Sequence, residues 1–182
     1  MRRIVLGVCL LLLATACSVP RAVPEGGVIA GQIVNTQGQV LILSTQDGQE
    51  QGQDPAHGSG RELVSALRKA LSAHAVPVSI SESRDVAQGY DEAAKIGFDY
   101  VLRPTITLWE DNATAWSGKG DKLEISIELY DVKSHRLTAA SSFYRVATGF
   151  TLASGTPDRF MDECSNGALG KIYGWPKDAP KR

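Results

Sequence analysis

One short segment gathers side chains that could bind a ligand. Residues 109–118 read WEDNATAWSG and place four such side chains at the end of a predicted strand and in the loop after it: Trp109, Glu110, Asp111 and Trp116. Tryptophan offers rigid apolar contact area, and carboxylates can hold a polar group or a cation. The segment also has a structural interpretation, in which the loop covers the end of the core. The sequence leaves both interpretations open.

The histidines form no recognisable catalytic or metal site. The three are His57, His74 and His135. None has a second histidine, a cysteine or a carboxylate at the spacing typical of metal ligands. The chain also has no G-x-S-x-G motif, which marks the nucleophile of many hydrolases. We therefore expect no metal, no cofactor and no enzymatic activity.

The amino-terminal segment has the order of an export signal. Arg2 and Arg3 are followed by an apolar run at 4–13 and by the small residues 14–16. This order is typical of a secretory signal peptide. The apolar run is shorter than the about 20 residues that a membrane-spanning helix needs. An ordinary signal peptide, cut after the small residues, is one interpretation of this pattern.

A cysteine stands directly after those small residues. With Cys17 at this position, the segment resembles a bacterial lipoprotein signal. The resemblance implies cleavage before Cys17 and attachment of lipid to its thiol, so the membrane is a partner through that lipid. Ser18, in place of Asp, resembles the pattern that Gram-negative bacteria sort to the outer membrane, which would leave the domain facing the periplasm.

Charge and cysteine content exclude some functions. The 182-residue chain has a net charge of -1, and loss of the two signal arginines leaves about -3. No basic patch favours nucleic acid as a partner. Removal of the signal and lipidation of Cys17 would leave Cys164 as the only thiol, so we expect no internal disulfide.

Hydrophobic periodicity predicts the elements that position these residues. Leu63, Leu67 and Leu71 recur at the spacing of an amphipathic helix. Period-two alternation is clearest at 100–110 and 123–132. The full pattern predicts strands at 40–44, 76–81, 100–110, 123–132 and 137–147, and helices at 60–74, 85–96 and 157–173. A weak strand at 28–34 could end the segment before them.

This order predicts an α/β two-layer sandwich. We expect a mixed sheet of about four to five strands that ends in an antiparallel meander, with the helices on one face and the other face open. The predicted organisation is a signal at 1–16, a lipidated cysteine and tether at 17–38, one domain at 39–174 and a disordered tail at 175–182.

The alternation also predicts what the open face carries. The residues that should share it are Arg103, Thr107, Trp109, Glu124, Glu128 and Tyr130, with Arg103 opposite or near Glu128. Tyrosine, tryptophan and arginine are enriched at protein interfaces, so this face and the 109–118 loop form the candidate interaction surface. A solvated face covered by one loop explains the pattern equally well.

The most specific run is Trp109-Glu110-Asp111, Trp116-Ser117-Gly118 and Asp121-Lys122. On this run the chain resembles a family of uncharacterised bacterial lipoproteins, a domain of unknown function, over roughly residues 38–173. The strand order is more distantly similar to the amino-terminal domain of the Tol-Pal translocation protein and to lipoproteins that activate peptidoglycan synthases. The resemblance implies an interaction domain and assigns no catalytic residue.

Three functional hypotheses follow. The first is a lipid-anchored, non-enzymatic domain that binds an envelope protein. The second is a domain that binds a small ligand, or is weakly catalytic, through Glu110 and Asp111. The third is a subunit of an oligomeric envelope assembly.

Overall fold

The long strands form where the sequence alternates. The computed structural model describes residues 25–112, 119–147 and 155–176. β4 (Tyr100–Glu110), β5 (Lys122–Asp131) and β6 (Arg136–Val146) pair antiparallel, as the sequence predicts. Every second residue of β5 is fully buried: Leu123, Ile125, Ile127 and Leu129.

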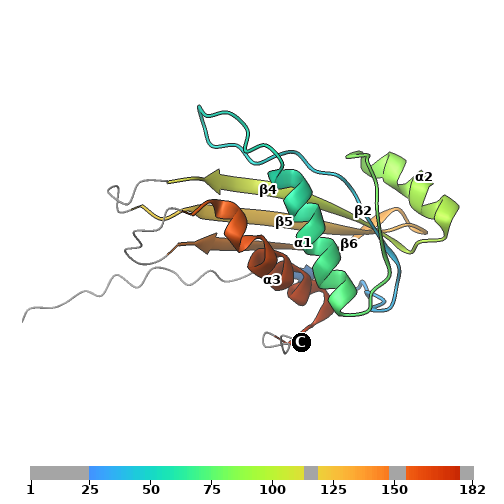
Figure 1. Cartoon of the computed structure of the whole chain (residues 1–182). Helices are drawn as coiled ribbons and strands as arrows, with labels where there is room; N and C mark the ends of the chain where they lie inside the picture. Colours follow the sequence, from blue (N-terminus) through green and yellow to red (C-terminus); the bar gives the residue numbers. More distant parts are fainter. Residues whose placement is uncertain (1–24, 113–118, 148–154, 177–182) are drawn as a thin grey trace, which may run out of the picture.

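Short parallel strands extend this meander on one side. β2 (Val40–Ile42) pairs with β4 and with the edge strand β3 (Val78–Ile80). On the other side, β1 (Glu25–Val28) pairs antiparallel with β6. The sheet therefore has six strands in the order β1-β6-β5-β4-β2-β3 (Figure 1). This mixed sheet confirms the predicted α/β class, and the sixth strand comes from the segment predicted to be a tether.

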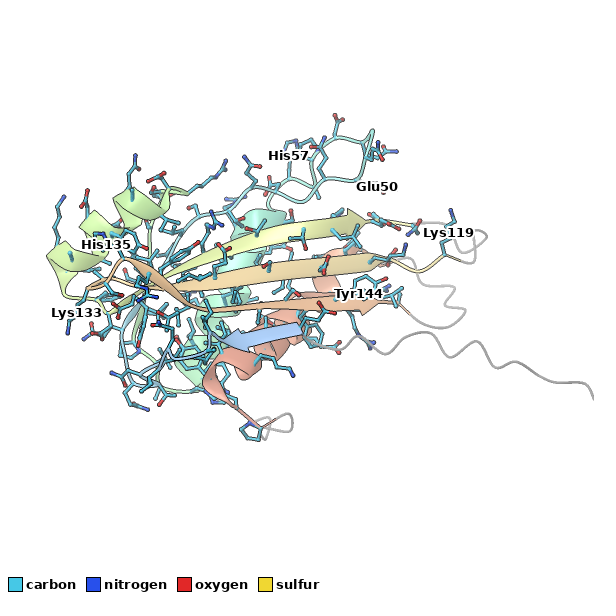
Figure 2. The ribbon with its side chains drawn as sticks, turned by 180° about the vertical axis from the view of Figure 1, so that it is seen from behind. Glu50, His57, Lys119, Lys133, His135 and Tyr144 are labelled. Atoms are coloured by element: carbon cyan, nitrogen blue, oxygen red, sulfur yellow. The ribbon has the colours of Figure 1, made fainter. Side chains whose placement is uncertain are left out.

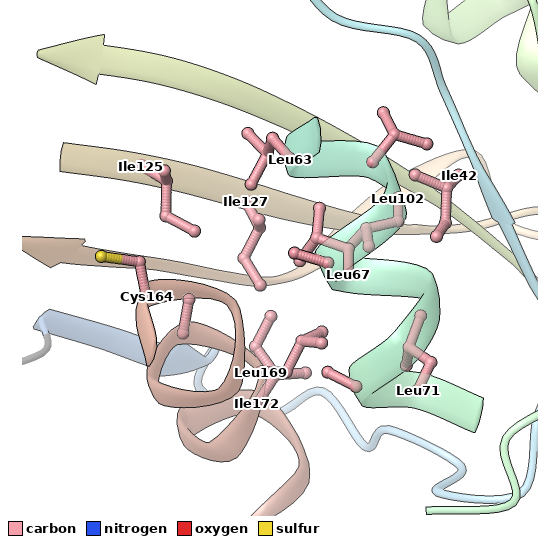
Figure 3. Close-up of a cluster of buried hydrophobic side chains, with 14 of the residues drawn as sticks. Ile42, Leu63, Leu67, Leu71, Leu102, Ile125, Ile127, Cys164, Leu169 and Ile172 are labelled. Carbon is pink, nitrogen blue, oxygen red and sulfur yellow. The ribbon is translucent and has the colours of Figure 1, made fainter. Parts of the chain in front are cut away.

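Two helices cover one face of the sheet. α1 (Ser59–Ala73) and α3 (Met161–Tyr173) lie side by side on it, and the 3-10 turn η1 (Pro157–Phe160) precedes α3 (Figure 1). Figure 3 shows the main core between these layers, where the leucines of α1 meet Ile125 and Ile127 of β5 and Leu169 and Ile172 of α3.

The third helix lies on the opposite face, contrary to the prediction that one face carries all the helices. α2 (Val86–Ile96) packs through Ala93 on Leu41, Leu43 and Val101. The neighbouring residues Val40 and Ile42 belong to the main core with α1. β2 is therefore buried on both sides, as expected for a strand of a β-α-β unit. α2 covers one end of the second face and leaves the rest of it without a helix.

Trp175, the first residue of the segment that the sequence predicts to be a disordered tail, packs on the ends of two helices. Its ring stacks on His74 with ring centroids 3.7 Å apart and on Tyr173 with centroids 4.9 Å apart. It thereby covers the junction between the ends of α1 and α3. Within the described residues, no helix is long and apolar enough to cross a membrane.

Candidate interaction surface

The face of the sheet that points away from α1 and α3 is called the outer sheet face here. Figure 2 shows it from behind, with α2 over one end. The strand registers place these side chains on it: Glu25, Arg103, Thr105, Leu108, Glu110, Lys122, Glu124, Ser126, Glu128, Tyr130, Ser142 and Tyr144. Short side chains occupy its middle, with Glu25 beside them on the edge strand β1, and the other charged and aromatic side chains lie toward the ends of the strands.

Arg103, Glu128 and Tyr130 form a connected cluster near α2. Arg103 is directly opposite Glu128, as the hairpin pairing predicts, and its Nε donates a hydrogen bond to Oε2 at 2.6 Å. The Tyr130 hydroxyl donates to the same oxygen at 2.8 Å. Burial and this hydrogen bond raise the pKa of Tyr130 to about 12. The hydroxyl therefore stays a proton donor at physiological pH, and the three side chains hold each other in place.

Aromatic contacts attach α2 to this cluster. The Tyr90 ring packs edge-to-face against the Tyr130 ring, with 6.2 Å between the ring centroids. It also stacks on the His135 ring, with 4.2 Å between the centroids. His135 lies in the β5–β6 turn with a positive φ of 53°. Edge-to-face and offset pairs of this kind contribute about 0.5–1.5 kcal/mol each beyond the area they bury. This end of the outer sheet face is thus a fixed structure.

A second cross-strand ion pair lies toward the other end. Glu110 and Lys122 are opposite each other, with 2.7 Å between the carboxylate and the ammonium group. The hydrogen bond from Lys122 lowers the pKa of Glu110, and the same contact raises the pKa of Lys122. Glu110 is therefore an ionised, paired side chain on the open surface.

Glu124 lies between these two pairs. Its register partners are Leu108 on β4 and Tyr144 on β6. Neither can neutralise a carboxylate. Across the described ranges, the ion pairs do not include Glu124 or the exposed Glu25 on β1. The outer sheet face consequently has two acidic side chains in excess of its paired charges.

Trp109 is not on the outer sheet face, which corrects the prediction. The β4–β5 register shifts between Ile106 and Leu108, so one extra residue enters β4. Such a bulge reverses the alternation beyond it. Leu108 moves to the outer sheet face and Trp109 turns into the core, where only 7% of it is exposed.

The loop after β2 closes over this tryptophan. Gly48 packs so closely that an added Cβ would lie 2.7 Å from the Trp109 ring. The Gly48 amide donates to the Ser59 hydroxyl at 2.8 Å, and the Gly60 amide donates to Asp47 at 2.9 Å. The start of α1 thus fixes the loop, and Trp109 seals the end of the core.

Asp111 points into a different environment from its neighbour Glu110. Its amide donates to Glu50 at 3.3 Å, while its buried Oδ1 has no hydrogen-bond partner. Burial and the nearby Asp121, Glu50 and Asp158 raise the pKa of Asp111. Arg159 of η1 pairs with Asp121. Glu110 and Asp111 therefore do not form one two-carboxylate site.

Replacement of Asp111 by asparagine should stabilise the domain. The raised pKa means that the folded state disfavours the charged carboxylate, so the penalty is present above the folded pKa and disappears below the unfolded pKa of about 3.9. We expect Asp111→Asn to raise the free energy of unfolding by about 0.5–1 kcal/mol at pH 7. Urea unfolding measured from pH 4 to pH 8 should show this difference shrinking toward pH 4, and a pH-independent difference would contradict it.

Trp116 and Cys17, two of the residues singled out in the sequence, lie outside the described ranges. Cys164 is fully buried on α3, and burial raises the pKa of its thiol to about 12, so it acts as a small apolar side chain. Among the described residues, no group of three or more histidine, cysteine or carboxylate side chains could hold a metal ion.

Comparison with known proteins supports the fold. No family model matches the chain, and no curated protein matches it in sequence. Among solved structures, the chain is similar to the PelC dodecamer of Paraburkholderia phytofirmans, with a TM-score of 0.59 and 14% identity over 84% of this chain and 99% of that one.

Two further solved structures are less similar. A DUF330 protein of Xanthomonas campestris has a TM-score of 0.48 and 13% identity, covering 81% of this chain and 91% of that one. Lipoprotein GNA1162 of Neisseria meningitidis has a TM-score of 0.45 and 11% identity, covering 63% and 88%. At these identities, the likeness to PelC establishes a shared fold alone.

Proposed function

We propose that the chain is a lipoprotein of the cell envelope, anchored through Cys17, whose domain works by binding protein and assembles with copies of itself. The observation that carries this proposal is the outer sheet face. It is a broad surface with fixed charged and aromatic side chains, and α2 covers only one end of it.

The composition of this face suits a protein partner. Arg103, Tyr130 and Tyr144 belong to the residue types enriched at interfaces. Arg103 and Tyr130 are already held by Glu128, so their ordering would cost little conformational entropy on binding. A preorganised sheet surface of this kind, without an enclosing layer over most of it, favours protein contacts over enclosure of a small molecule.

The hypothesis of a ligand or catalytic site at Glu110 and Asp111 has less support. Glu110 is neutralised by Lys122 on the open surface. Asp111 faces Glu50 and Asp121 instead. A pair of carboxylates that work on one substrate must face a common space, whereas the closest partners of these two differ: Lys122 for Glu110, and Asp121 and Glu50 for Asp111. We therefore propose a non-enzymatic role.

The similarity to PelC favours self-assembly among the possible protein contacts. PelC was solved as a dodecamer, and the similarity extends over 99% of its chain. Repeated use of one head-to-tail contact closes a ring when the rotation between neighbours fits a whole number of copies. We propose that this chain forms an oligomer of that kind at the membrane surface.

Native mass spectrometry of the full chain, extracted from membranes in mild detergent, tests this function. We expect one defined oligomer with many more than two copies. A monomer at micromolar concentration, in detergents of differing micelle size, would overturn self-assembly. Crosslinking in intact cells before extraction is the control for dissociation by detergent.

A further inference from the structure

We infer that the contact between neighbouring copies joins the basic side of α1 on one copy to the outer sheet face of the next. This inference rests on the self-assembly proposed above and names its two surfaces. The occupant of the outer sheet face is then a helix of a second copy of this chain. Charge complementarity between two separate surfaces of the same molecule supports it.

The first surface is a stripe on α1 called the arginine stripe here. It consists of Arg61, Ser65, Arg68 and Ser72, which are all exposed and follow one another at helical spacing. Within the described residues, neither arginine forms an ion pair. Lys69, on the side of α1 that faces α3, pairs with Asp162 and is already neutralised.

The arginine stripe is accessible because of where α1 lies. α3 lies along one side of α1 (Figure 1), and the sheet beneath α1 ends at the edge strand β3. No described helix follows beyond that edge. Arg61 lies close enough to Asp47 to help lower the pKa of that carboxyl, so Arg68 is the arginine of the stripe that has no such carboxylate beside it. The serines between the two arginines add little bulk, so the stripe can approach an acidic surface closely.

The second surface is the outer sheet face. Its ion pairs Arg103–Glu128 and Glu110–Lys122 are neutral, so Glu124 and Glu25 set the sign of its charge. The middle of this face carries the short side chains of Thr105, Ser126 and Ser142, which project less from the sheet than the charged and aromatic side chains around them. A helix could lie across these short side chains with its arginines reaching the two unpaired glutamates.

The two surfaces lie on different sides of the molecule, and this determines the kind of assembly. α1 is on the opposite side of the sheet from the outer sheet face, near β3, whereas Glu25 is on the other edge strand, β1. Because the two surfaces lie on opposite sides of the sheet, one neighbouring copy cannot contact both of them at the same time. The contact is therefore head-to-tail, which generates a ring or a filament. Packing of two outer sheet faces against each other would instead bring like charges together.

A charge-reversal experiment tests the assignment. Arg68→Glu and Glu124→Lys are made singly and together in the full chain, and assembly is measured by native mass spectrometry and by dilution in mild detergent. Each single variant places like charges in the contact and should raise the dissociation constant about tenfold or more. The double variant restores an opposite-charge pair and should return it to within about threefold of wild type.

Matched controls and contrary outcomes are available. Lys133→Glu and Asp54→Lys reverse exposed charges in the β5–β6 turn and in the loop before α1, and should leave assembly unchanged. Circular dichroism checks that each variant is folded. If wild type assembles and the single variants assemble equally well, or the double variant fails to recover, this contact is wrong while self-assembly stands. If wild type is monomeric, the proposed function itself fails.

Discussion

Replacement of Trp109 by alanine is expected to lower the free energy of unfolding by about 3–5 kcal/mol, the range for loss of a large aromatic side chain from a core. Trp109 is 7% exposed and packs within the main core. Its ring is also the surface on which Gly48 and the loop before α1 rest. Removal would leave a cavity at the end of the sheet and release that loop.

Urea unfolding followed by circular dichroism measures this effect without using tryptophan as the reporter. Tyr144→Ala is a matched control, because Tyr144 is a half-buried aromatic residue on the outer sheet face of the adjacent part of the sheet. We expect a loss of about 1 kcal/mol or less for the control. A loss below 1 kcal/mol for Trp109→Ala would mean that Trp109 does not seal the core.

The position of Trp109 could not be predicted by counting alternate residues. A strand pattern is extrapolated at two residues per repeat, and one extra residue changes the side of every residue after it. Pro104, three residues before Thr107, favours an edge or a bulge in this strand, but it does not fix the position of the extra residue. Arg103 and Glu128 pair before the bulge, where the two-residue repeat still holds, so the sequence predicts their positions correctly. Trp109 lies after the bulge, where the repeat is shifted by one residue.

Hydrophobic periodicity predicts the helices and strands that bury a single continuous apolar face. The leucines of α1 and the alternation of β5 each have a single buried side, and the structure confirms both. The side of the sheet taken by α2 depends on topology instead, because β2 lies between β3 and β4. A right-handed connection on each side of a central parallel strand places successive helices on opposite faces.

The edge strand β1 could not be predicted from the sequence for a different reason: it is short and rich in glycine. β1 has the sequence EGGV, which lacks both alternation and β-branched residues before its last position. Gly26 fits because any side chain would meet the carbonyl of Ala140, only 2.3 Å from an added Cβ. The strand therefore exists through its backbone pairing with β6, and this signal is absent from hydrophobicity.

Replacement of Cys17 by serine is expected to move almost all of the protein from the membrane pellet to the soluble fraction. The proposed anchor supplies the membrane affinity: each buried methylene contributes about 0.8 kcal/mol, and stable attachment needs more than one acyl chain. A serine hydroxyl does not accept the lipid that the lipoprotein signal directs to a thiol. The variant would then behave as an exported protein without an anchor.

Fractionation after high-salt washing distinguishes this anchor from other kinds of membrane attachment. Cys164→Ser is the matched control, because the buried thiol lies in the core and its loss should leave the protein in the pellet. Metabolic labelling with a fatty acid should mark wild type and Cys164→Ser but not Cys17→Ser. Wild-type protein in the soluble fraction would overturn the lipid anchor. Retention of unlabelled Cys17→Ser in the washed pellet would instead show that assembly or another membrane component holds the domain there.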